Sequence, residues 1–143
     1  LAIIAILALM TVPSYMDRVV RQQIEAALPL AEIAKKPVAD SWAQLHAFPA
    51  DNAAAGLPAE EKIVSNHVSS LSVQDGAIHI TFGNRTSKAI SGKVLTLRPA
   101  VVADAPVVPV AWVCGTAQMP KKMTIQGVNR TNIPDSFLPL ACR

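Results

Sequence analysis

The sequence predicts an α+β fold in which one long N-terminal helix packs on an antiparallel sheet of about four strands. Three observations support this prediction. Helical periodicity extends to about Ala47, apolar and polar positions alternate from Val68 onward, and the chain from Gly115 to Arg143 has no regular period. We divide the 143 residues into a hydrophobic stalk, residues 1–16, and a globular head, residues 17–143, which includes the second part of the helix.

The stalk is apolar on every side of a helix, and no charge occurs before Asp17. A helix of this length rises roughly 24 Å, less than the roughly 30 Å hydrocarbon core of a bilayer. A signal peptide, a membrane anchor and a buried core helix are the alternatives. We favour a retained stalk, because an amphipathic pattern continues directly past Pro13 and a helix that is apolar all round is covered by lipid or by neighbouring protein. The chain starts inside the apolar run, so we expect the gene product to begin upstream of Leu1. The side chains expected to be covered are Leu1, Ile3, Ile4, Ile6, Leu7, Leu9, Met10, Val12 and Tyr15.

Beyond the stalk, apolar residues recur at steps of three and four, which is the period of one helix face. This main stripe, predicted to pack on the sheet, comprises Val20, Ile24, Ala27, Ala31, Val38, Trp42 and Leu45. A second stripe lies off it and comprises Val19, Ala26, Leu30 and Ile33. One head does not easily cover both stripes, so the second stripe suggests a neighbouring molecule; the alternative is scattered exposed apolar residues. Pro29 and Pro37 predict kinks rather than helix ends.

Four strands are expected after the helix. A hairpin begins at Val68 and turns at Asp75-Gly76. Its inward side chains are Leu71, Val73, Ile78, Ile80 and Phe82. Lys93 to Leu97 predicts a third strand, closed by Pro99, and Val107 to Cys114 predicts a fourth.

Charge and cysteine content restrict the function classes. The formal charge of +3 is mild and no run of like charges exceeds two residues, so nucleic-acid binding is not indicated. The cysteines, Cys114 and Cys142, fit one disulfide in an oxidising compartment; two free thiols are the alternative.

No catalytic constellation is found. His46, His67 and His79 lie on three different elements without metal-ligand spacing, and we interpret all three as solvated, with His79 on the outer face of its strand. There is no glycine-rich phosphate loop, nucleophile elbow or CxxC pair. We therefore predict a protein that is not an enzyme and that uses no metal or cofactor.

Several segments, taken in order, resemble the type IV pilins, and more closely their type IVa class. The segments are Val12-Pro13-Ser14-Tyr15, Asp75-Gly76 before an alternating strand, Gly92 to Pro99, Trp112-Val113-Cys114-Gly115, and the ending Leu138 to Arg143. The resemblance covers essentially the whole chain and places the two cysteines where that family closes its disulfide-bounded C-terminal region. The family begins with an N-methylated residue and, shortly after it, a glutamate. Neither is present here, because alignment on Pro13 places Leu1 inside the family's stalk.

The resemblance implies a structural subunit that is held in the inner membrane of a Gram-negative bacterium and then packed stalk against stalk into an extracellular pilus, a helical polymer of identical subunits. It implies surface attachment, twitching motility and, in some members, DNA uptake, with prepilin peptidase and the pilus assembly machinery as partners. In the filament, we expect the helix to melt at Pro13, which lacks the donor for Leu9. The alternative is a binding module of the same fold: a minor pilin acting as adhesin or DNA receptor, or a secretion-system pseudopilin.

Overall fold

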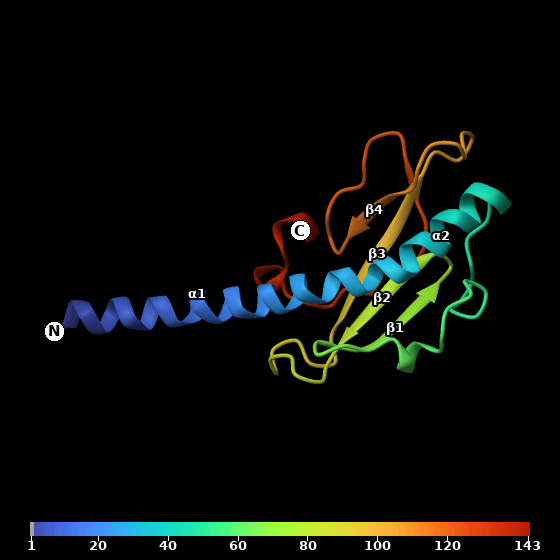
Figure 1. Ribbon diagram of the computed structural model, residues 1–143. Coiled ribbons are helices and arrows are strands. Elements are labelled where there is room, and N and C mark those ends of the chain that lie inside the picture. The colour runs from blue at the N-terminus through green and yellow to red at the C-terminus, as the bar shows by residue number, and fades with distance from the viewer. Residues whose placement is uncertain (1) are drawn as a thin grey trace.

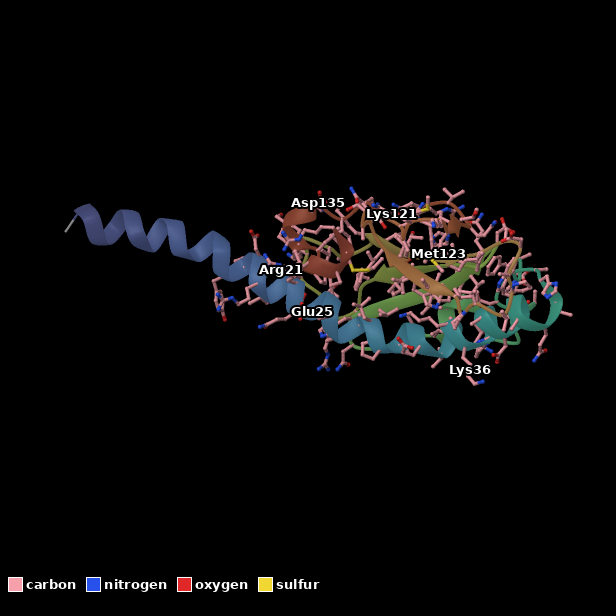
Figure 2. The ribbon with its side chains drawn as sticks, turned by 90° about the horizontal axis from the view of Figure 1, so that it is seen from above. Arg21, Glu25, Lys36, Lys121, Met123 and Asp135 are labelled. Atoms are coloured by element: carbon pink, nitrogen blue, oxygen red, sulfur yellow. A yellow bond between two sulfur atoms is a disulfide. The ribbon has the colours of Figure 1, made fainter. Side chains whose placement is uncertain are left out.

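The computed structural model describes residues 2–143, with side chains described from Tyr15 onward. The N-terminal half of the long helix projects away from the head, and its second half crosses one face of an antiparallel sheet (Figure 1). Seen from above, much of the C-terminal segment lies on the other side of the sheet, and its end, near Asp135, lies beside α1 (Figure 2). This arrangement confirms the predicted α+β fold.

The helix consists of α1 (Ala2–Ala27), a 3₁₀ turn (Leu28–Ala31) and α2 (Glu32–Leu45). The turn contains Pro29, whose missing backbone donor and ring explain why regular α-helix is interrupted there. Pro37 lies inside α2, so neither proline ends the helix. The end is capped by His46, which adopts a left-handed conformation and donates its backbone N–H to the carbonyl of Trp42 at 2.9 Å.

The sheet has five strands: β1 (Val68–Gln74), β2 (Ala77–Phe82), β3 (Val94–Val101), β4 (Ala111–Cys114) and β5 (Thr124–Ile125). The first four lie in the order β1-β2-β3-β4, and every pairing is antiparallel. The short β5 pairs with the far end of β3. The predicted four strands are therefore present, and the C-terminal segment adds a fifth.

The turn between β1 and β2 is formed by Asp75 and Gly76, with φ of 50° and 88°. Two successive positive φ values match the two-residue hairpin turn whose twist suits antiparallel strands. The backbone N–H groups of these residues donate to the carbonyls of Ala50 and Pro49, which ties the turn to the segment that follows α2. A Cβ at Gly76 would lie 2.8 Å from the Phe48 ring, so only glycine fits this close approach.

Two predicted strand boundaries are wrong. β3 does not close at Pro99 but continues to Val101, because β4 and β5 pair with it beyond Leu97, where its register with β2 ends. The fourth strand begins at Ala111 and not at Val107. Residues 102–110 form turns instead, and the side chain of Val107 is 89% exposed.

The core lies between the helix and the sheet. Its members on the strands include every inward side chain predicted for the hairpin, together with Leu95 and Leu97 of β3. The buried main-stripe residues of the helix are Val20, Ile24, Ala27, Ala31, Val38 and Trp42. Leu45, predicted to join them, is 73% exposed. Phe48 closes this end of the core instead, since its ring stacks on that of Trp42 with centroids 5.0 Å apart.

The opposite face of the sheet is also covered, which the strand alternation did not predict. Ala77, His79 and Thr96 are all buried, although they alternate with the helix-facing residues. The cover is the C-terminal segment: Gly127 approaches Ala77 so closely that a Cβ on Gly127 would lie 2.5 Å from the Ala77 Cβ. Assignment of His79 to a solvated outer face was therefore wrong, because this sheet is covered on both sides.

Candidate assembly surface and disulfide-closed tail

The projecting part of α1 is the first candidate surface. Helix is continuous through Pro13 in the single subunit. Tyr15 is 62% exposed, and Met16 beside it is also exposed. No helix in the described part of the chain is both long and apolar enough to span a membrane. The remaining stalk side chains predicted to be covered, which lie outside the described side chains, are Leu1, Ile3, Ile4, Ile6, Leu7, Leu9, Met10 and Val12.

The structure divides the second stripe into two classes. Val19 and Leu30 are half-buried, and Leu30 packs against the edge of the core. Ala26 is exposed, and the Ile33 side chain is 46% exposed. Ile33 is therefore the large apolar residue of this stripe that the head leaves most open to a neighbouring molecule.

Polar contacts join α1 to both flanks of the head. An Nη2–H group of Arg21 donates to the carbonyl of Ser136 in the C-terminal segment at 3.1 Å. Near it, the Gln23 Oε1 accepts the backbone N–H of Ser87, in the connection between β2 and β3, at 2.8 Å. These two hydrogen bonds fix α1 to the head of its own subunit. Figure 2 shows Arg21 on the side of the helix that faces the C-terminal segment.

Ion pairs on the helix are few and exposed. Within the described side chains, the ion pairs are Lys35 with Glu32 at 3.0 Å and Lys36 with Asp40 at 3.2 Å. Pairs of this spacing on a helix surface contribute about 0.2–0.5 kcal/mol each. Charge therefore adds little to the energy of this surface compared with its apolar side chains.

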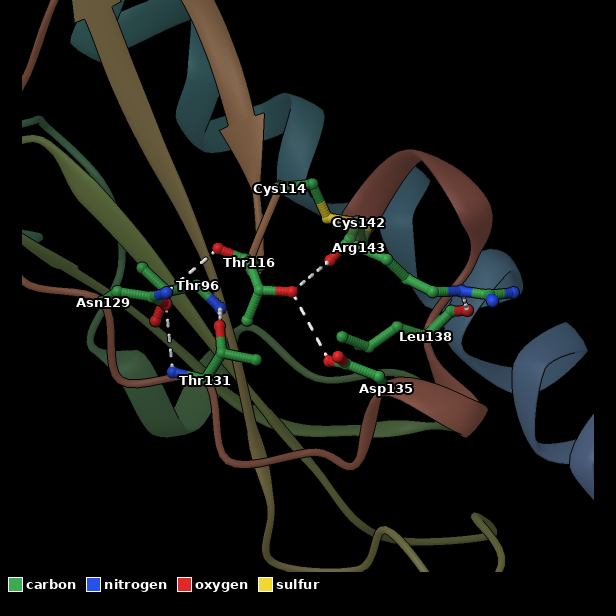
Figure 3. Close-up of a disulfide and its surroundings, with 10 residues drawn as sticks. Thr96, Cys114, Thr116, Asn129, Thr131, Asp135, Leu138, Cys142 and Arg143 are labelled. Atoms are coloured by element: carbon green, nitrogen blue, oxygen red, sulfur yellow. Dashed lines mark hydrogen bonds between the residues drawn. A yellow bond between two sulfur atoms is a disulfide. The ribbon is translucent and has the colours of Figure 1, made fainter. Parts of the chain in front are cut away.

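The second candidate region is the tail, which we define as residues 115–143. A disulfide joins Cys114 at the end of β4 to Cys142 (Figure 3). The backbone carbonyl of Cys142 accepts hydrogen bonds from the backbone N–H and the hydroxyl of Thr116, at 3.0 and 3.3 Å. Arg143 donates its Nε–H to the carbonyl of the buried Leu138 at 3.0 Å. The end of the tail is thus fixed by covalent and polar contacts together.

The middle of the tail is bonded to β3 at Thr96. The Thr96 backbone N–H donates to the Thr131 hydroxyl, and the Thr96 hydroxyl accepts the backbone N–H of Arg130, both at 3.0 Å. Asn129 adds a bond from its side-chain amide to the carbonyl of Gly115, also at 3.0 Å (Figure 3). Side chains therefore supply the backbone partners that a regular strand would supply elsewhere.

His79 lies beneath this part of the tail and is only 4% exposed. Its Nδ1 is 2.8 Å from the Thr96 hydroxyl. Burial, with the nearby Arg130 guanidinium as a second cause, lowers the pKa of His79 from 6.5 to about 4. Strand alternation did not predict this burial, and the only signal for it was that the outward positions of β2, occupied by Ala77 and His79, carry no permanent charge.

The other two histidines lie outside the strands of the sheet. His46 is exposed at the helix end, and His67 is half-buried just before β1. Among the described residues, no group of three or more His, Cys, Asp or Glu side chains could hold a metal ion. An open depression of about 600 Å³ lies beside Trp42 and Phe48, and its lining includes His46 and Asp75.

Comparison with known proteins gives consistent matches. A family described as pilin, bacterial filament, matches residues 20–143. The type IV major pilin protein PilE of Neisseria gonorrhoeae is 31% identical over the whole of this chain and 87% of its own length. The type IV major pilin protein PilE1 of the same species is 30% identical over the whole chain and 81% of its own length. The fimbrial protein EcpC of Eikenella corrodens is 38% identical over 68% of this chain and 66% of its own length.

Proposed function

Because the chain belongs to the pilin family of bacterial filament subunits, we propose that it is the repeating structural subunit of an extracellular type IV pilus that serves surface attachment and twitching motility. The observation that carries this proposal is the long helix. One side of it is buried against the sheet, while Tyr15, Met16 and Ile33 leave apolar side chains uncovered. The N-terminal part of the helix projects away from the head (Figure 1). DNA uptake is a further role that the family resemblance implies, and it is tested separately from assembly.

Packing between helices is the expected source of assembly energy. Burial of three leucine- or isoleucine-sized side chains per subunit contact supplies roughly 5–9 kcal/mol before the costs of association. An exposed charge pair supplies about 1 kcal/mol or less. Identical subunits related by a helical operation make the same contact repeatedly and form an open polymer. We place the subunit in the inner membrane before assembly and expect processing by a prepilin peptidase.

The state of α1 at Pro13 is part of this proposal. The proline leaves the carbonyl of Leu9 without its helical donor, so residues near Pro13 lose fewer hydrogen bonds than a regular turn when neighbouring stalks stretch the helix. We expect the helix to melt locally at Pro13 in the filament, although it is continuous there in the isolated subunit. Side-chain-resolution imaging of sheared filaments tests this; continuous α-helix through Pro13 in the filament would contradict it.

The assembly surface is tested by Ile33→Asp in the full-length precursor. We expect loss of nearly all surface filaments, counted by electron microscopy, because a desolvated carboxylate is costly in an apolar contact. Val64→Asp is the matched control, since it places the same charge on a valine that is 49% exposed and lies outside the helix, shortly before β1. Arg18→Ala, which removes an exposed helix charge, should weaken filaments only slightly. Arg21 is unsuitable for this purpose because it bonds to Ser136.

Folding of the head must be measured in the same variants, through protease resistance and the intact disulfide. A folded Ile33→Asp head without filaments supports the assembly surface. Normal filaments from this variant would return Ile33 to the class of scattered exposed apolar residues. Loss of filaments from Val64→Asp as well would show that added charge, and not the helix surface, is responsible.

The relatives named major pilins favour a major subunit over a minor pilin or a pseudopilin. Copy number distinguishes these roles. A major subunit should dominate the protein in a sheared-filament preparation, whereas a minor pilin should be a trace component of filaments built from another chain.

A further inference from the structure

We propose that His79 is an acid-sensitive latch: protonation of its imidazole releases residues 127–132 of the tail from the sheet, while the Cys114–Cys142 disulfide keeps the tail attached. The observation that carries this inference is a chain of contacts that leads from a buried titratable ring to the tail through a single threonine. The latch goes beyond assembly of the filament, since it concerns the surface that each head presents after folding.

The Thr96 hydroxyl is the central group of the latch. It accepts the backbone N–H of Arg130 at 3.0 Å, and an N–H group can only donate. The hydroxyl has one proton of its own, and the Nδ1 of a neutral His79, 2.8 Å away, is placed to accept it. Thr96 is bonded to the tail a second time, because its backbone N–H donates to the Thr131 hydroxyl. The neutral ring therefore completes the bonding of the residue that holds the tail.

Protonation removes this arrangement. The Nδ1 of an imidazolium carries a proton and can only donate to the Thr96 hydroxyl oxygen, so the proton of that hydroxyl loses its acceptor. The second ring nitrogen, Nε2, is buried and has no partner among the described residues. A buried charge with one N–H group unpartnered and no counter-ion is strongly disfavoured.

The charged groups near the ring are of the wrong sign to compensate. Arg130 faces it from the tail, and Arg98 lies on the same face of β3 as Thr96 by strand alternation. Directly opposite on β1 is the uncharged Ser72. None of β1, β2, β3, β4 and residues 127–132 contains an aspartate or a glutamate. Solvation of the imidazolium therefore requires the tail to move away.

The size of the effect follows from the two states. In the closed state burial, and secondarily Arg130, lowers the pKa of His79 to about 4, whereas a released, solvated ring returns to its ordinary pKa of 6.5. Above pH 6.5 both states are neutral and the closed state keeps its full stability. As the pH falls from 6.5 to 4, only the released state binds the proton, so closure is progressively lost. At pH 5 the opening equilibrium should be about 30-fold higher than at pH 7.5.

Amide hydrogen exchange, followed by NMR on the full chain in detergent micelles, measures this opening directly. After correction for intrinsic exchange, the amides of Arg130 and Asn132 should open about 30-fold more at pH 5 than at pH 7.5. The amide of Ile80, in the central strand pair, should be unchanged. His79→Gln keeps a neutral hydrogen-bonding side chain and should abolish the pH response, while His46→Gln, which changes an exposed histidine, should preserve it.

An equal response in His79→Gln would overturn the proposal, as would a wild-type chain with no response. If His79→Gln fails to fold, titration of the His79 ring in the wild-type chain decides the question. A pKa well below 6.5 that coincides with the loss of Arg130 protection supports the latch, and a pKa at or above 6.5 overturns it. Intact mass at both pH values should show the disulfide unbroken.

Discussion

The two faces of the sheet are closed by different kinds of contact. On one face the main stripe of the helix meets apolar strand residues such as Leu71, Ile80 and Phe82, and nearly all of the contact is hydrophobic. On the other face residues 127–132 of the tail are held by hydrogen bonds from side chains to backbone around Thr96 and by close glycine packing at Gly127. Beyond them the disulfide anchors the end of the tail, where Ile133 and Leu138 join the same apolar core as the helix.

This difference separates two kinds of stability. Apolar contacts scale with buried area and do not depend on a single pair of atoms. Hydrogen bonds in the tail depend on the position of each donor and acceptor, and a buried group left without its partner costs about 1–3 kcal/mol. We therefore expect the helix face to determine whether the head folds, and the tail face to determine how firmly the C-terminal segment is attached.

The largest effect is expected on the helix face. Phe82→Ala removes a fully buried ring from the core and should lower the free energy of unfolding by about 4 kcal/mol. Chemical denaturation of the full chain in detergent measures the change, with Phe82→Leu as a milder control. A loss below about 1 kcal/mol would mean that the helix face is not the main source of stability.

Cys142→Ser is expected to have the next largest effect, and on the tail face. Loss of the cross-link between residues 28 positions apart should cost about 3–4 kcal/mol by the chain-entropy estimate. The tail should then be cleaved rapidly by a protease, while helix and sheet remain. Cys114→Ser should behave in the same way. Collapse of the entire head in either variant would contradict the separation between the two faces.

Gly127→Ala should destabilise by about 2 kcal/mol, because the added methyl group meets Ala77 and the residue has a φ of 90°. Gly56→Ala is the matched control: its φ is also positive, at 73°, but no atom lies within 4 Å of the added Cβ. Denaturation of both variants separates close packing from backbone strain. Equal losses would show that the approach of the tail to Ala77 is unimportant.

The smallest expected effect is that of Thr131→Val, about 1 kcal/mol, since it removes the acceptor for the Thr96 backbone N–H while keeping the side-chain shape. Hydrogen exchange at the Thr96 amide should increase in parallel. Thr131→Ser restores the hydroxyl and should recover most of the protection. If Thr131→Ser exchanges as fast as the valine variant, the hydroxyl is not the group that holds the tail.

The helix face could be predicted from the sequence because periodicity records it. Steps of three and four identify Val20 and Ile24, and alternation identifies Leu71 and Ile80, since each such residue faces one continuous apolar surface. The exception is Leu45, which keeps the helical period of the main stripe but lies one step beyond the part of the helix that the head covers. Periodicity describes the local chain and carries no information about where the surface opposite it stops.

The tail face could not be predicted in the same way. Its bonds join Thr96 to Thr131 and Arg130 across more than thirty positions, and no repeat marks such pairs in a single sequence. The burial of His79 follows from that cover and not from its own strand, whose alternation is typical of a sheet with one wet face. Only the disulfide, from two late cysteines, signalled that the tail is held in place.

The bonds of Arg21 and Gln23 also determine how the head carries mechanical force. They join neighbouring positions of α1 to Ser136 and Ser87, which are 115 and 64 residues away along the chain. Tension that enters through the projecting end of α1 reaches these two bonds and the apolar contacts from Val20 onward together, so the load is divided among them. Tension along the axis of α1 loads these contacts in shear, so we expect them to resist together and not one after another.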